Sequence, residues 1–150
     1  MLFRSSWEPN QDATVWTFHL NPNGRFSDGS GVTADDFVYA WNRVANPKTV
    51  STSTGQPDPS MISYHLAFVS GFSEMASGKT DRLAGVRALD ELTLEVRLDE
   101  PFADFEYVVA HPALAPVPAK YVEAGVEYDG ETIAFGEMPV GNGPFQMAVV

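Results

Sequence analysis

Histidine is the residue type in this sequence best suited to acid–base or metal chemistry, and the chain has three histidines. His19, His65 and His111 are about 46 residues apart, whereas zinc-binding histidines on one helix are roughly four residues apart. The chain also has no cysteine that could provide a thiolate ligand. The sequence therefore predicts no metal site, and no other cofactor is expected.

Adjacent carboxylates could serve as a catalytic acid and base, but their positions favour structural roles. Three such pairs occur: Asp35-Asp36, Asp90-Glu91 and Asp99-Glu100. Neighbours in sequence point to different faces of a helix or strand, and each pair lies at an expected helix start or turn. No serine lies in a G-x-S-x-G motif, and no calcium-binding or phosphate-binding motif is present. The sequence predicts no catalytic residue and a protein that is not an enzyme.

Tyr64 and His65 are the side chains that best fit a ligand-binding role. They follow a long loop over residues 48–60 that is rich in Ser, Thr, Gly, Pro and Asp. A tyrosine offers an apolar ring with a hydroxyl tip, and a histidine offers a donor or an acceptor, so together they offer a ligand both apolar and polar contacts. The alternative is that Tyr64 begins a core helix and is half-buried for packing alone.

The other two histidines have simpler interpretations. We expect His19 on the polar face of a strand. His111 is expected to cap the negative end of the short helix that precedes Pro112.

The elements that must position these residues follow from hydrophobic period and from turn residues. Thr33 and Asp36 have the spacing of a capping box, and Asn46-Pro47 ends the helix that follows. The expected strands are 15–20, 86–89, 93–98 and 143–150, and the expected helices are 33–46, 64–76 with a break near Gly71, 103–110 and 118–125. This pattern predicts an α+β fold in which helices pack on a small antiparallel sheet.

Length and composition support a single domain over residues 1–150 with one apolar core. The aromatic residues number 10 Phe, 5 Tyr and 3 Trp, which distinguishes the chain from acidic disordered sequences. Trp7, Trp16 and Trp41 each lie in an apolar strand or helix pattern, and we expect all three in the core.

The charge of the chain limits its partners. Nine Lys and Arg against 20 Asp and Glu give a net charge of −11, which disfavours nucleic acid and anionic lipid surfaces. No stretch approaches the roughly 20 apolar residues that would span a bilayer, so no membrane insertion by this chain is expected. No signal peptide is recognisable at residues 1–8, so any export signal is expected outside this chain. The apolar pattern over 145–150 leads us to expect a piece of a longer protein.

Several ordered motifs together resemble one family. They are VWTFHL (15–20), FSDG (26–29), VTADDFVYAW (32–41), GVRALDE (85–91), TLEV (93–96), HP (111–112), PVP (116–118) and NGPF (142–145). In this order they are similar to a segment of the oligopeptide-binding proteins that serve ABC importers, the extracellular solute-binding proteins of family 5. The resemblance spans about Trp7 to Phe145.

The resemblance carries its own expectations. Members of the family are two-lobed proteins that trap a peptide between the lobes, and this chain resembles the second subdomain of the first lobe. It implies oligopeptides and the permease subunits of an ABC transporter as partners of the full-length parent. It also implies an extracytoplasmic location, in the periplasm or as a cell-surface lipoprotein. The stretch near Tyr64 and His65 corresponds to the place where this subdomain reaches the ligand.

A stand-alone, non-enzymatic interaction module that uses the same fold to bind a protein partner is the alternative function. An exposed apolar patch would favour that alternative.

Overall fold

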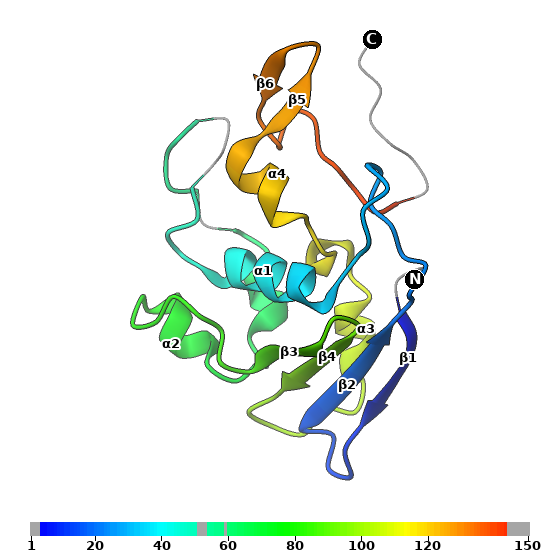
Figure 1. Cartoon of the computed structure of the whole chain (residues 1–150). Helices are drawn as coiled ribbons and strands as arrows, with labels where there is room; N and C mark the ends of the chain where they lie inside the picture. Colours follow the sequence, from blue (N-terminus) through cyan, green and yellow to red (C-terminus); the bar gives the residue numbers. More distant parts are fainter. Residues whose placement is uncertain (1–3, 51–53, 59, 144–150) are drawn as a thin grey trace.

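The fold is built on a four-stranded antiparallel sheet with the strand order β1-β2-β4-β3 (Figure 1). The computed structural model describes residues 4–50, 54–58 and 60–143. The strands are β1 (Arg4–Pro9), β2 (Val15–Leu20), β3 (Val86–Asp90), β4 (Thr93–Arg97), β5 (Val126–Tyr128) and β6 (Glu131–Ile133). The helices are α1 (Ala34–Ala45), α2 (Phe72–Ala76), α3 (Phe105–Val109) and α4 (Ala119–Ala124), with 3-10 helices η1 (Ser63–Leu66) and η2 (Pro112–Leu114). The predicted α+β class with a small antiparallel sheet is confirmed.

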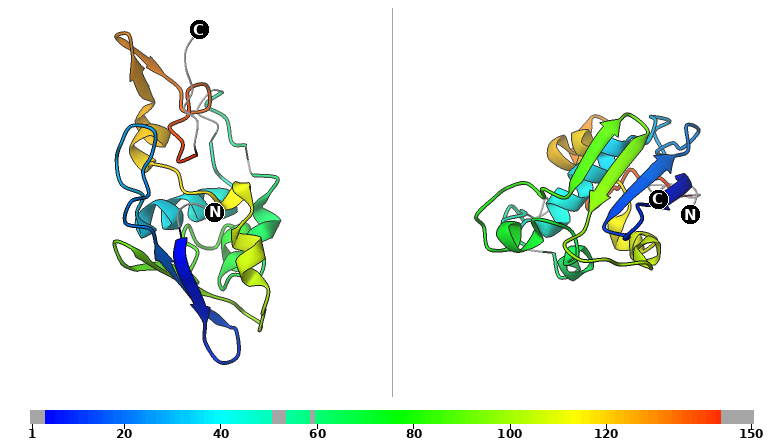
Figure 2. Two further views of the ribbon diagram at one scale, coloured as in Figure 1. Left: turned by 90° about the vertical axis from the view of Figure 1, so that its right-hand side faces the viewer. Right: turned by 90° about the horizontal axis from the view of Figure 1, so that it is seen from below.

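One face of the sheet forms the core. Alternate residues of β2 are buried, and Trp16 and Phe18 lie directly opposite Val96 and Leu94 of β4. Directly opposite residues of paired strands point to the same side of a sheet, so these four side chains share one face. The helices pack against the sheet (Figure 2), and Phe105 of α3 contacts Trp16 and Phe18 on this face.

Helix α1 begins and ends where the sequence predicts. The Thr33 hydroxyl accepts the Asp36 backbone N–H, and the Asp36 carboxylate accepts the Thr33 backbone N–H at 2.8 Å. Phe37 and Trp41 are buried on the side that faces the sheet layer, and Asn46 is the C-cap. The Trp41 indole N–H donates to the carbonyl of Leu114 at 2.9 Å, which ties α1 to η2.

The prediction that all three tryptophans lie in the core is wrong for one of them. Trp16 and Trp41 are buried, but Trp7 is 47% exposed. Trp7 lies opposite Phe18 and so points to the core face, but β1 is the edge strand of the sheet. An edge strand has a neighbour on one side only, so its side chains are covered on one side only.

The predicted helix over 64–76 is also wrong in its extent. The structure has η1, then a β-bridge between Val69 and Leu98, and only then α2. Ser70 donates its backbone N–H to Arg97 and accepts from Gly85, so this stretch bonds to the end of the sheet instead of to its own turns. Gly71 has φ of +84°, which only glycine adopts without strain and which breaks the helix there.

Helix α4 and the β5–β6 hairpin extend away from the sheet (Figure 1) and are tied back by polar contacts. The Asp28 carboxylate accepts from Lys120 Nζ at 3.0 Å and from the Tyr121 hydroxyl at 2.9 Å. Burial on its own would raise the pKa of Asp28, but hydrogen bonds from Ser30, Lys120 and Tyr121 outweigh it and hold that pKa well below its usual value. Asp28 is therefore the polar joint between the turn after β2 and α4.

The loop that follows α1 is narrow in the part that the structure describes. Val50 and Pro57 form an isolated antiparallel bridge, and the Asp58 N–H donates to the Thr49 carbonyl at 2.7 Å. The predicted strand over 143–150 lies outside the described residues apart from Gly143. Among the helices that are described, none is both long and apolar enough to cross a membrane.

Candidate functional site

The short helix η1 presents Tyr64 to the solvent. Tyr64 is 62% exposed, while Leu66 of the same helix is fully buried and anchors it. The alternative in which Tyr64 packs in the core is therefore wrong. Phe68 and Ser70, which follow η1, bond to the end of the sheet, so η1 is a single turn fixed at the surface of a rigid layer.

His65 joins Tyr64 to a residue that the sequence did not connect with it. The ring centroids of Tyr64 and His65 lie 4.2 Å apart, and those of His65 and His111 lie 4.2 Å apart with an interplanar angle of 28°. We call these three rings the aromatic stack. Tyr64 and His111 are exposed, and His65 is half-buried.

The predicted role of His111 is wrong. The backbone N–H of His111 donates to the Val108 carbonyl in the last turn of α3 at 3.0 Å, but its ring bonds on the other side, to η2. Its Nδ1 accepts the backbone N–H of Ala113 at 3.2 Å, and it is the N-cap of η2. An accepting ring nitrogen carries no proton, so Nδ1 of His111 is the acceptor nitrogen of this ring. The reason is Pro112, which opens η2 and places His111 at the start of that turn.

The surroundings of His65 disfavour its charged form. Burial lowers the pKa of His65 below its usual value, and the charge that His111 carries when protonated lowers it further. In the part of the chain that the structure describes, no carboxylate forms an ion pair with either ring. The stack is therefore a ring surface in which the charged form of His65 is disfavoured.

Tyr107 of α3 is a further exposed aromatic side chain. It is 72% exposed. The buried Phe105 and Val109 lie on the other side of α3. Sequence reasoning did not single out Tyr107 or pair His111 with His65.

Among the residues that the structure describes, no group of three or more His, Asp or Glu side chains could hold a metal ion. The contact between His65 and His111 is therefore not part of such a group. The stack offers flat faces to apolar groups and ring nitrogens and a hydroxyl to polar groups. Such a surface suits the binding of a molecule that has both apolar side chains and amide groups.

Comparison with known proteins defines the class. The chain matches the bacterial extracellular solute-binding proteins, family 5, over residues 1–149. It belongs to that family.

Individual relatives are similar over most of this chain. The periplasmic oligopeptide-binding protein OppA of Salmonella typhimurium is 45% identical over 118 residues, which cover 78% of this chain and 20% of OppA. The periplasmic murein peptide-binding protein MppA of Escherichia coli is 38% identical over 125 residues, or 83% of this chain and 22% of MppA. The chain thus spans about a fifth of the length of these relatives.

Solved structures agree with the fold. The unliganded open form of MppA superimposes with a TM-score of 0.79 at 33% identity, covering 99% of this chain and 27% of that one. OppA of Haemophilus influenzae in complex with the peptide RPPGFSPFR gives a TM-score of 0.78 at 32% identity, covering 98% and 27%. The relatives are binding proteins, and nothing in these comparisons favours the alternative of a stand-alone interaction module.

Proposed function

We propose that the chain is part of the substrate-binding component of an ABC-type oligopeptide importer and contributes to peptide capture without catalysing a reaction. The observation that carries this proposal is the similarity to OppA and MppA over most of the chain, in sequence and in fold. The exposed aromatic stack on a rigid layer supports it, because a module that accepts many peptides needs contact area and hydrogen-bonding edges but no reactive side chain.

Within this function, we propose that Tyr64 and His65 contact the peptide. Tyr64 is exposed and its ring lies against His65, so a ligand would meet a surface that is already ordered. A preformed surface costs less conformational entropy on binding than a mobile one. Residues 1–150 would act as one domain, corresponding to a first-lobe subdomain of an extracytoplasmic parent protein that delivers its peptide to permease subunits.

Isothermal titration with mixed tripeptides to pentapeptides tests the proposal. We expect no binding tighter than millimolar by this chain alone, because the family captures its peptide between two lobes. Micromolar binding by the chain alone would contradict the two-lobed interpretation.

The site is tested in a protein that joins this chain to the remaining length of its relatives. Tyr64→Ala should weaken peptide affinity about threefold to tenfold, the value of one lost aromatic contact. The melting temperature should change little, because an exposed side chain contributes little to stability. Tyr128→Ala is the matched control, since Tyr128 is an exposed tyrosine on β5. A large drop in melting temperature with unchanged affinity would assign Tyr64 to the scaffold.

A further inference from the structure

Residues 118–141 contain α4 and the β5–β6 hairpin and project from the sheet layer (Figure 1), and we call them the arm. Strands β5 and β6 form a two-stranded sheet of their own. Among the residues that the structure describes, one backbone hydrogen bond joins the arm to the rest of the chain, from the Ser27 N–H to the Gly141 carbonyl at 2.7 Å. Backbone bonding therefore holds the arm at a single point.

The apolar contacts of the arm are incomplete. Val122 is the buried residue of α4, but it lines a pocket of about 460 Å³ between α1 and α4 instead of joining the core cluster. A second pocket, of about 260 Å³, lies between the arm and the turn at Ser27 and Asp28. Val126 and Val140 do reach the core, and at 8% exposure they are its two most exposed members. Closely packed elements leave little space between them, so the seam between the arm and the sheet layer is loosely packed.

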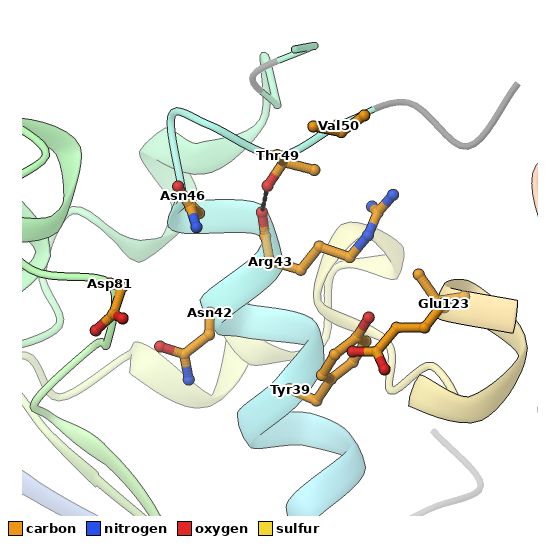
Figure 3. Close-up of a pocket in the computed structure, with 9 residues that line it drawn as sticks. Tyr39, Asn42, Arg43, Asn46, Thr49, Val50, Asp81 and Glu123 are labelled. Atoms are coloured by element: carbon orange, nitrogen blue, oxygen red, sulfur yellow. Dashed lines mark hydrogen bonds between the residues drawn. The ribbon is translucent and has the colours of Figure 1, made fainter. Parts of the chain in front are cut away.

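Two polar contacts cross this seam. The Asp28 carboxylate accepts from Lys120 Nζ at 3.0 Å and from the Tyr121 hydroxyl at 2.9 Å. Tyr39 of α1 and Glu123 of α4 point toward each other (Figure 3), and the Tyr39 hydroxyl donates a hydrogen bond to Glu123. Burial and the negative charge of Glu123 raise the pKa of Tyr39, and this hydrogen bond raises it further. Polar side chains thus make up much of what fastens α4.

Such contacts are easier to break than the contacts of the other helices. The side chain of Lys120 is 59% exposed, so water can replace its partner when the contact opens. Helix α3 is instead fixed by the fully buried ring of Phe105, and α1 by the fully buried Trp41. Regions with few buried apolar contacts open at the lowest cost in free energy. The arm is therefore the part of the described structure best able to move without unfolding the core.

We infer that the arm moves as a unit between the closed position of this structure and an open position in which α4 has left α1, and that the contacts at Asp28 and Glu123 hold it closed. Opening would join the two pockets to solvent and uncover Val122. The arm lies outside the aromatic stack, and the inference does not rest on the proposed function.

Distances between spin labels test this motion in the full chain. The sequence has no cysteine, so nitroxide labels attach only to introduced cysteines. Glu131→Cys on β6 with Leu89→Cys on β3 reports the arm, and Ser6→Cys on β1 with Leu89→Cys reports the sheet; all three positions are exposed. Double electron–electron resonance should give a second, minor distance for the arm pair and one narrow distance for the sheet pair.

Variants then test what holds the arm closed. Asp28→Asn should raise the ratio of open to closed molecules about fivefold to tenfold, because it weakens the hydrogen bonds that opening breaks. Tyr39→Phe should raise the ratio about threefold, and the two effects should multiply in the double variant, because one motion breaks both contacts. Asp12→Asn is the matched control, since the Asp12 carboxylate bonds to Thr14 within its own turn.

Three results would overturn the inference. The first is a single narrow distance for the arm pair in the unchanged chain, in Asp28→Asn and in the double variant. The second is an equal broadening of the sheet pair in Asp28→Asn, which would mean that the whole fold loosens. The third is an equal effect of Asp12→Asn and Asp28→Asn. If Asp28→Asn fails to fold, Lys120→Gln serves in its place, because it removes one donor to the same carboxylate.

Discussion

The molecule has two groups of aromatic side chains that differ in what covers them. In the core, Trp16, Phe18 and Phe105 have ring centroids 6.1 to 6.4 Å apart and are at most 2% exposed. At the surface, the rings of the aromatic stack are closer, at 4.2 Å, but Tyr64 and His111 remain exposed. Close ring contact is therefore not a sign of core packing in this protein.

The difference separates stability from binding. Burial of an aromatic ring removes a large apolar area from water, which stabilises the folded chain. An exposed stack stabilises it little, but keeps ring faces available to another molecule. We therefore expect substitutions in the core to change the free energy of unfolding and substitutions in the stack to change binding.

The largest expected effect is that of Trp41→Ala. Trp41 is fully buried, stacks edge-on against Phe37 and donates its indole N–H to Leu114. Its removal should lower the free energy of unfolding by about 3–5 kcal/mol in urea denaturation. Trp41→Phe keeps most of the ring volume and loses the hydrogen bond, so it should cost less. A loss below 1 kcal/mol for Trp41→Ala would show that this part of the core is not packed as described.

Asp28→Asn tests a polar contact, and its expected effect on stability lies between those of a buried and an exposed aromatic side chain. Replacing the carboxylate weakens its contacts with Lys120 and Tyr121, which should cost about 1–2 kcal/mol at pH 7. The pKa of Asp28 is lowered from 3.8 in the folded chain, so its ionised form stabilises the fold above that pH. This contribution is lost as the pH falls below 3.8 toward the lower folded pKa.

The pH dependence gives the control for this variant. Between pH 7 and pH 3, the unchanged chain should lose more stability than Asp28→Asn, as measured by denaturant unfolding at each pH. Equal losses would show that Asp28 is not a significant joint between the turn after β2 and α4.

Thr33→Ala tests a local contact at the start of α1. The substitution removes the hydroxyl that accepts the Asp36 N–H, which should lower the free energy of unfolding by about 1 kcal/mol. Thr33→Ser keeps the hydroxyl and should restore most of the stability. The measurement is the urea midpoint of the three proteins, and a Ser variant as unstable as the Ala variant would contradict the capping role.

The smallest effect on stability is expected for Tyr107→Ala. Tyr107 is more exposed than Tyr64 and lies on the solvent side of α3, so the change in the free energy of unfolding should stay within about 0.5 kcal/mol. A thermal melt of Tyr107→Ala beside Trp41→Ala measures the contrast directly. A comparable loss in the two variants would remove the distinction between the buried and the exposed rings.

The sequence by itself determined the elements that depend on near neighbours. The capping box at Thr33, the end of α1 at Asn46, strand β2 and the hairpin of β3 and β4 all match the predictions. Each depends on contacts within a few residues or on a repeat of apolar side chains, and such information is present in a short window. The family resemblance draws on the same motifs.

Only the tertiary structure decided how distant segments meet. The contact of His65 with His111 joins segments that no sequence period relates, and the 46-residue spacing that argued against paired histidines does not prevent them from meeting. The exposure of Trp7 follows from the edge position of β1, which is set by the order of strands. Residues of α1 and α4, Arg43 and Glu123 among them, line one pocket because these two helices pack together. Long-range packing fixes all three, and a local pattern carries no record of which element will cover a given side chain.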